Sequence, residues 1–333
     1  NRIAPNVRNG HVTLLSHIAE SARHPTLRDP LQAALQRPET AVLAVITDVF
    51  GASYRLPGTM MTLFADGDFA GGLTNGCIEG DLAHHAAECL RGGNVARLRY
   101  GAGSPFFDIR LPCGGALEVA LYPRPNARAL AETLSLRSAR KASALCFGAD
   151  GGLASVAARP TGWAGTDFAV AVQPEIRVEV FGEGPEAAIF SHLLQSAGYL
   201  HCLTTPSEPT RDMAALGGCN VRLDLRDDAL DPQAIDARTA VVAFFHDHGR
   251  EISILQAALS SPAFYIGAQV NRQVAARRCD QLADLGVAPA ALQRLHGPIG
   301  LIPSARDART LAVSVLAEII ATAEQRAGIS RPA

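Results

Sequence analysis

The sequence predicts an α/β protein with two domains: a mixed α+β domain first, then a Rossmann-like domain with a parallel sheet. Three observations lead to this expectation. The chain has 333 residues, more than a single hydrophobic core usually serves. Short strand-forming runs bounded by glycine fill its first half. From Arg177 onward, strands and helices alternate, as in βαβ units. Gln173-Pro174-Glu175 interrupts the pattern, so we place the domains at 11–174 and 175–330.

The N-terminal half contains several runs of β-branched and aromatic residues bounded by glycine, proline or aspartate, which predict strands. These runs are 40–50, 60–67, 115–123, 141–148 and 167–172. Residues 78–90 place apolar side chains near helical spacing and predict an amphipathic helix. The glycine-containing stretch between 148 and 167 predicts a loop.

The second half opens with a strand, a glycine turn and a helix. Gly182-Glu183-Gly184 follows the strand, and Pro185 suits the first helical turn because its missing N–H has no partner there. Ala187 takes the third position of a GxGxxA fingerprint. Such a turn directs backbone N–H groups at an anion, so Gly182, Gly184 and Pro185 predict a phosphate contact, with close packing as the alternative.

Polar residues follow two later strands of this domain. His246-Asp247-His248 ends one strand, and Gly267 precedes a helix that carries Arg272. A further histidine, His296, lies in a Gly- and Pro-containing loop. Ligands of open α/β sheets bind outside the carboxyl ends of the strands, so these residues predict ligand contacts. The alternatives are surface histidines and a solvated arginine.

The thiol of Cys77 lies between an Asn75-Gly76 turn and the predicted helix at 78–90. The positive end of a helix dipole favours a thiolate, and glycine lets a ligand approach the backbone closely. Glu79 would cap the helix or hold a ligand amine. A second glycine-flanked thiol, Cys113, precedes the strand at 115–123. Thiolates suit soft metal centres, so Cys77 and Cys113 are candidate metal ligands, with buried structural cysteines as the alternative.

Arg55 lies in a turn before the strand at 60–67. Its guanidinium could bind a phosphate with two hydrogen bonds, or cap a neighbouring helix.

The composition excludes some classes of partner. A formal net charge of −2 and dispersed arginines make nucleic acid an unexpected ligand. Apolar runs are too short to span a membrane, which predicts a soluble protein. Seven cysteines without a Cys-x-x-Cys pair suggest free thiols in a reducing compartment, so we expect the cytoplasm.

Several segments together resemble the XdhC/CoxI family of accessory proteins for molybdenum hydroxylases, such as xanthine dehydrogenase and aldehyde oxidoreductase. They are "GASYRLPGTMM" (51–61), "GGLTNGCIEGDL" (71–82), "LPCGGALEVAL" (111–121), "VVAFFHDHGREISILQAALSSPAFYIG" (241–267) and "RLHGPIGL" (294–301).

The resemblance implies a cytoplasmic, homodimeric chaperone without turnover of its own. Such a protein binds the molybdenum cofactor, in its molybdopterin or cytosine dinucleotide form. It protects the cofactor while a cysteine desulfurase partner adds a sulfido ligand, and it inserts the cofactor into the apo-enzyme of its hydroxylase client.

Two other functions remain open from the residues. A glycine turn suits NAD(P) as well, which would make the chain an oxidoreductase with His246 or His248 as general acid or base. The expected acid after the second strand is missing, however, since Thr204, Thr205 and Ser207 stand there. The remaining alternative is a protein-interaction scaffold.

Overall fold

The computed structural model describes residues 24–74, 76–102, 114–226, 230–245 and 248–326, and for His248 and Arg272 it describes only the backbone. The contacts divide the chain after Pro174 into unit 1, residues 1–174, and unit 2, residues 175–333.

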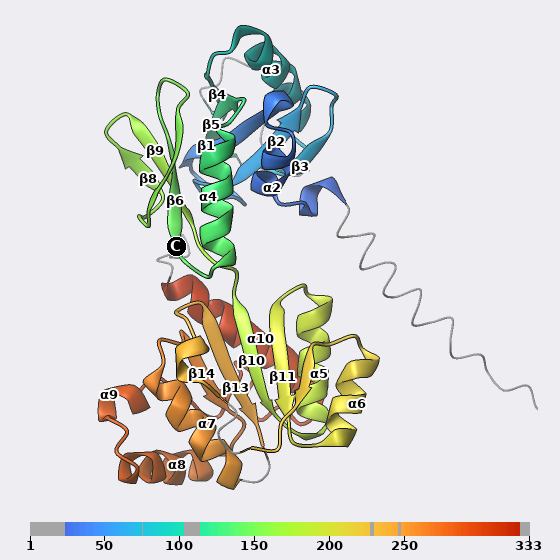
Figure 1. Ribbon diagram of the computed structural model, residues 1–333, viewed down its shortest axis with the longest axis vertical. Helices are drawn as coiled ribbons and strands as arrows, with labels where there is room; N and C mark the ends of the chain where they lie inside the picture. The colour runs from blue at the N-terminus through green and yellow to red at the C-terminus, as the bar shows by residue number, and fades with distance from the viewer. Residues whose placement is uncertain (1–23, 75, 103–113, 227–229, 246–247, 327–333) are drawn as a thin grey trace, which may run out of the picture. The chain divides into compact units, whose positions relative to one another are not determined.

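Unit 1 is built on an antiparallel sheet with the strand order β3-β2-β1-β5-β4 (Figure 1). Its strands are β1 (Ala41–Phe50), β2 (Met60–Phe64), β3 (Phe69–Gly71), β4 (Ala96–Gly101) and β5 (Ala116–Pro123). The first seven residues of β1 are buried, because both faces of the sheet are covered. β1 is therefore the central strand of this unit.

Two layers cover the sheet of unit 1. Helix α3 (Glu79–Gly92) packs on one face through Leu82, Ala86 and Cys89. The other face packs against α2 (Pro30–Gln36), α4 (Ala127–Ser138) and a second antiparallel sheet. That sheet has the order β7-β6-β9-β8, with β6 (Ser143–Phe147), β7 (Leu153–Ala157), β8 (Gly162–Ala164) and β9 (Asp167–Val172). Short 3-10 helices cover Pro25–Leu27 and Pro38–Thr40.

The predicted loop between 148 and 167 is wrong, because it contains β7 and β8. Both pair with longer strands that the sequence does predict, β7 with β6 and β8 with β9. Pairing to a neighbour, rather than local propensity, makes these short segments strands.

Unit 2 has a parallel sheet with the strand order β12-β11-β10-β13-β14-β15 (Figure 1). Its strands are β10 (Arg177–Gly182), β11 (Leu200–Thr205), β12 (Val221–Leu223), β13 (Thr239–Phe244), β14 (Tyr265–Ala268) and β15 (Leu295–His296). In chain order this is the 3-2-1-4-5-6 arrangement of a Rossmann fold. The strand order reverses between β10 and β13, where such folds bind their ligands.

Helices cover both faces of this sheet. One core cluster holds residues of α5 (Gly184–Ser196), α6 (Glu208–Leu216) and α10 (Ala308–Arg326), and another holds residues of α7 (His248–Ser260) and α8 (Arg272–Asp284). The short α9 (Pro289–Leu292) and a 3-10 helix at Pro232–Ala234 complete the unit. The predicted Rossmann-like parallel sheet is confirmed.

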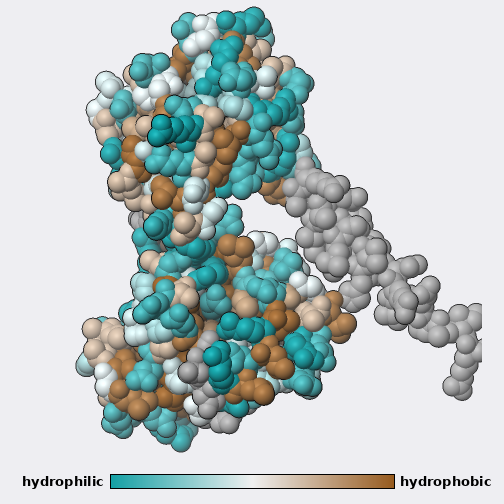
Figure 2. Space-filling model, viewed as in Figure 1, coloured by the Kyte–Doolittle hydropathy of each residue, from teal (hydrophilic) through white to brown (hydrophobic). Residues whose placement is uncertain are grey.

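Apolar and polar side chains are interspersed on the face of the molecule shown in Figure 2. Among the helices that the structure describes, none combines the length and the apolar character that crossing a bilayer requires.

Candidate functional site

Three loops of unit 1 leave the same end of its first sheet. Val45 pairs with Met60, and Met61 pairs with Gly71, so the loops 51–59 and 72–78 begin at this end. Ala116 pairs with both Phe50 and Gly101, which places the 102–115 connection there as well. The topology therefore brings the segments that carry Arg55 and Cys77 to one sheet end. Cys113 and Asn75 lie outside the described residues.

A network of hydrogen bonds holds the segment around Cys77. The carboxylate of Glu79 accepts bonds from the Thr74 amide at 2.6 Å, the Thr74 hydroxyl at 2.6 Å and the Ile78 amide at 3.2 Å. The Cys77 amide donates to the Thr74 hydroxyl oxygen at 3.1 Å. The carboxylate and one hydroxyl thus hold the backbone of this loop.

Cys77 is exposed. The helix after it starts at residue 79, one residue later than the predicted start at 78. Helix α3 begins at Glu79, with Ile78 as its N-cap and no side-chain cap on the helix. The side chain of Glu79 accepts the backbone amide of Ile78, the N-cap residue, and two further bonds from Thr74 in the loop before it. Gly76 has φ +97°, a conformation that L side chains rarely adopt, which explains glycine at this position.

Glu79 is half-buried, and its hydrogen bonds lower its pKa more than its burial raises it. Loss of water alone would raise the pKa of this carboxyl, but the donors of Thr74 and Ile78 hold it below its ordinary value. Glu79 is therefore charged at neutral pH.

The β4–β5 end of the sheet adjoins the start of α3. Tyr100, the buried penultimate residue of β4, donates a hydrogen bond of 2.6 Å from its hydroxyl to Asp81 in the first turn of α3. Gly115 packs so closely on the backbone of Ala52 that a Cβ would overlap the Ala52 carbonyl. These contacts fix the bases of the three loops against one another.

Arg55 is exposed in the 51–59 loop, beside Tyr54, whose side chain is 89% exposed. The backbone amide of Arg55 donates to the Ser53 hydroxyl oxygen at 3.1 Å. Within the part of the chain that the structure describes, its guanidinium caps no helix. The side chain is accessible to an anion.

The glycine turn of unit 2 has the predicted strand and helix on its two sides, with Pro185 in the first turn of α5. Two of its backbone amides already donate hydrogen bonds within the protein. Glu183 donates its amide to the Phe244 carbonyl at 2.9 Å, and Gly184 donates its amide to the hydroxyl oxygen of Thr210 at 2.9 Å. Gly182 is required here because a Cβ would overlap the backbone of Phe244.

Two acidic residues stand at this turn. Glu183 is the N-cap of α5, and Glu186 lies in its first turn. Both carboxylates would repel a phosphate, and one of the amides expected to bind it is already donated to Thr210. At the end of β11, Ser207 uses its hydroxyl to cap α6, and no acid precedes it there. Ribose recognition as in NAD enzymes therefore has no carboxylate at the expected position.

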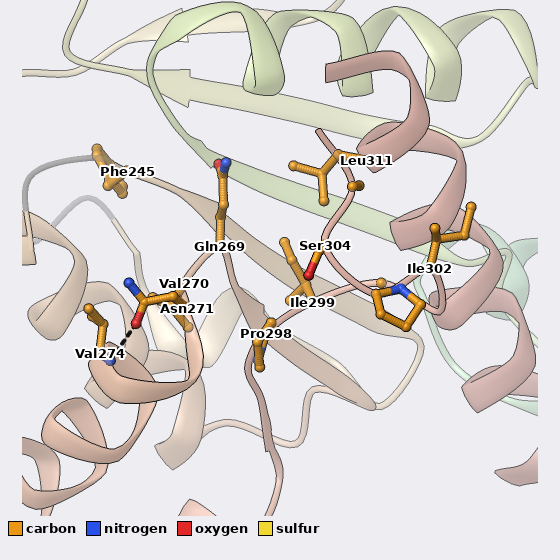
Figure 3. A pocket seen from close by; sticks show the side chains of 13 residues that line it. Phe245, Gln269, Val270, Asn271, Val274, Pro298, Ile299, Ile302, Ser304 and Leu311 are labelled. Carbon is orange, nitrogen blue, oxygen red and sulfur yellow. Dashed lines mark hydrogen bonds between the residues drawn. The ribbon is translucent and has the colours of Figure 1, made fainter. Parts of the chain in front are cut away.

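A cavity of about 910 Å³ opens beside the carboxyl ends of β13 and β14 (Figure 3). Its polar groups are the side chains of Gln269, Asn271 and Ser304, and its apolar walls include Phe245 and Ile299. Among the described residues that line it, none has a charged side chain. Its volume lies within the range of about 300–1,000 Å³ that is usual for small-molecule sites.

His296 and Gly267 lie behind this cavity. The His296 ring is stacked on Tyr265, 4.4 Å between ring centroids, and lies 3.0 Å from a carboxylate oxygen of Glu318. The other oxygen of Glu318 accepts bonds of 2.7 Å from the Tyr265 hydroxyl and the Gly300 amide. Gly267 is inside β14, where a Cβ would overlap Tyr265 and Ile299. Both residues therefore support the cavity wall in this structure.

The remaining predicted residues are only partly described. His246 and Asp247 lie outside the described residues, and His248 and Arg272 are the first residues of α7 and α8. Nearby, Glu251 of α7 and Arg278 of α8 form a buried ion pair. Burial raises the pKa of Glu251 to about 7, although Arg278 opposes the shift.

The described residues contain no cluster of three or more His, Cys, Asp or Glu side chains placed to hold a metal ion. Sequence reasoning missed Gln269, Asn271 and Ser304 as cavity residues. Asn271 stands beside the predicted Arg272, and a polar residue directly after a predicted strand was the available signal for Gln269.

Comparisons with known proteins agree with this architecture. A model for the XdhC Rossmann domain matches residues 178–319, and a model for the XdhC and CoxI family matches residues 34–101. The chain is 33% identical over 290 residues to the molybdenum cofactor insertion chaperone PaoD of Escherichia coli strain K12. This alignment covers 86% of this chain and 84% of that protein.

A solved structure, described as a xanthine dehydrogenase from Bacillus halodurans, has the same fold. Its TM-score is 0.69 at 21% sequence identity, and the match covers 91% of this chain and 97% of that chain.

Proposed function

Because the chain belongs to the XdhC and CoxI family, we propose that it is a chaperone that binds the molybdenum cofactor and inserts it into a molybdenum hydroxylase. The observation that carries this proposal is the 33% identity, over most of both chains, to a molybdenum cofactor insertion chaperone. We further propose that a cysteine desulfurase partner sulfurates the bound cofactor, and that the chain works as a homodimer.

The residues present fit such a cofactor, which is a phosphorylated pterin that holds molybdenum through two sulfurs. In unit 1, we assign the metal end to Cys77 and Cys113, because the thiol of Cys77 is exposed and thiolates suit soft metals. Asn75 and Gly76 would allow close approach, and Glu79 would order the loop. Arg55, with its exposed side chain, would bind a phosphate oxygen.

Unit 2, taken by itself, offers a second candidate site, and we propose that its cavity and the predicted residues around it bind an organic group of the cofactor. Gly182, Gly184 and Pro185 shape the adjoining turn, while His248 and Arg272 begin α7 and α8. We include His246 and Asp247 in this proposal from the sequence alone, because they directly precede α7. Gly267 and His296 support the wall. We propose the cytosine dinucleotide form as the bound form, and the cavity volume of about 910 Å³ supports this larger ligand.

Transfer to a client enzyme tests this function. The chain, loaded anaerobically with cofactor, is mixed with a hydroxylase that lacks it, and the hydroxylase activity is followed over time. We expect faster and more complete activation than with the same amount of free cofactor. Equal activation with free cofactor contradicts the chaperone role. Reduction of added NAD(P)+ to NAD(P)H by an alcohol or aldehyde, catalysed by the chain alone, would favour the oxidoreductase instead.

A further inference from the structure

The cavity of unit 2 differs from a phosphate site in its chemistry. Its described lining offers the carboxamides of Gln269 and Asn271 and the hydroxyl of Ser304, without a charged group. The neighbouring glycine turn carries Glu183 and Glu186. Among the described residues, a lining of carboxamide, hydroxyl and apolar groups favours a neutral polar part of a ligand over an anion.

The carboxamide of Gln269 is available to a ligand. Gln269 directly follows β14, and its backbone amide donates to the Ala243 carbonyl at 2.9 Å, which fixes the residue at the carboxyl ends of the central strands. In Figure 3 its side chain extends into the cavity between Phe245 and Leu311. Within the described chain, its amide group has no hydrogen-bond partner from another residue.

The side chain of Asn271 uses its oxygen within the protein and leaves its nitrogen available to a ligand. Its Oδ1 accepts the Val274 amide at 2.9 Å and so caps α8. In Figure 3 the nitrogen of the same side chain points away from Val274. Asn271 can therefore donate a hydrogen bond to a ligand without losing the helix cap.

We propose that this cavity binds a planar heterocycle, a pterin or a nucleobase, whose edge carries an adjacent hydrogen-bond donor and acceptor. A primary carboxamide offers the complementary pair, acceptor oxygen and donor nitrogen, in one plane. Val274, Pro298, Ile299 and Ile302 provide apolar surface for the faces of the ring. The inference deepens the proposed function and rests on it for the identity of the ring.

Calorimetric titration of the full chain tests the proposal. The probes are cytidine 5′-monophosphate, adenosine 5′-monophosphate and pterin-6-carboxylate, and ribose 5-phosphate serves as the probe without a ring. We expect at least one ring probe to bind roughly tenfold more tightly than ribose 5-phosphate. Failure of every ring probe to bind better than ribose 5-phosphate overturns the proposal.

Two variants locate the binding. Gln269→Leu should weaken the binding of the ring roughly tenfold and leave ribose 5-phosphate unchanged, because it removes only the donor and acceptor pair. Gln293→Leu, the same change on the exposed surface, is the matched control and should have no effect. Asn271→Asp keeps the cap of α8 but loses the donor, so it should also weaken ring binding. If Gln269→Leu does not fold, this second variant decides.

The preferred probe separates this inference from the proposed function. Preference for the cytosine or pterin probe supports both. Preference for adenine alone supports a ring site but contradicts a molybdenum cofactor as its ligand. Ring binding that both variants leave unchanged overturns the assignment of the cavity.

Discussion

The carboxylate of Glu79 accepts hydrogen bonds from both the amide and the hydroxyl of Thr74, each at 2.6 Å. A third bond, from the Ile78 amide, closes the segment between them. The exposed thiol of Cys77 is presented by a loop that one charged side chain holds together.

Replacing that carboxylate should loosen the loop. We expect Glu79→Gln to lower the free energy of unfolding by about 1–3 kcal/mol, since hydrogen bonds to a charged acceptor are replaced by bonds to a neutral one. Calorimetric melting at pH 7 measures the change. Glu132→Gln, on an exposed position of α4, is the control and should leave the melting temperature unchanged.

The same contacts predict a pH dependence. The pKa of Glu79 is below its ordinary value of 4.5, so its stabilising contribution is complete above that value and is lost as the pH falls through the lowered pKa of the folded protein. The difference in melting temperature between wild type and Glu79→Gln should therefore shrink between pH 5 and the acid limit of folding. A difference that stays constant over this range would contradict the role of the charge.

The cysteines should differ in their reaction with iodoacetamide. Cys77 is exposed, whereas burial raises the pKa of Cys89 and raises that of Cys219 to about 11. Among the cysteines that the structure describes, we expect Cys77 to be alkylated well before these two at neutral pH. Peptide mass spectrometry over time measures the order, and Cys77→Ser should lose the early adduct. Equal rates for Cys77 and Cys219 would show that the loop is closed.

Local sequence patterns predicted the parts of the fold that local chemistry determines. The strand, the turn at Gly182 and the start of α5 at Pro185 could be predicted from residue type. Glycine permits the close approach of the backbone, and proline suits the first turn of a helix. Strand β4 was not predicted, since Arg97 and Arg99 interrupt its apolar pattern. Its place depends on pairing with β5, a contact that no local pattern encodes.

Gly182 should tolerate no side chain. At Gly182→Ala the new Cβ would overlap the Phe244 backbone at φ +151°, so we expect a loss of roughly 2–5 kcal/mol of stability. Gly198→Ala is the matched control, because its φ of +77° is strained but no atom lies within 4 Å, and it should cost about 1–2 kcal/mol. Denaturant unfolding compares the two. Equal losses would mean that close strand packing does not require Gly182.

Glu318 should control the wall of the cavity through His296, Tyr265 and Gly300. Glu318→Gln weakens three contacts, so we expect a lower melting temperature and weaker binding of the heterocycle probe. Glu324→Gln, exposed on the same helix, should change neither. Unchanged probe affinity in a destabilised Glu318→Gln protein would limit Glu318 to a structural role.

The candidate cavity could be predicted only in part. A ligand crevice beyond the parallel strands followed from the fold, but Gln269 and Ser304 meet there from segments 35 residues apart. The hydrogen bond from the Gly184 amide to the Thr210 hydroxyl could not be predicted either, because nothing in the sequence shows which amide a threonine of α6 will bind. Tertiary contacts, rather than motifs, decide which groups of the glycine turn remain for a ligand.

The most direct test of the account is the content of molybdenum and pterin per chain after anaerobic purification from cells that make the cofactor. We predict both near one per chain in the wild type, and a marked loss of both in Gln269→Leu and of molybdenum in Cys77→Ser. A wild-type protein that carries neither molybdenum nor pterin would contradict the account.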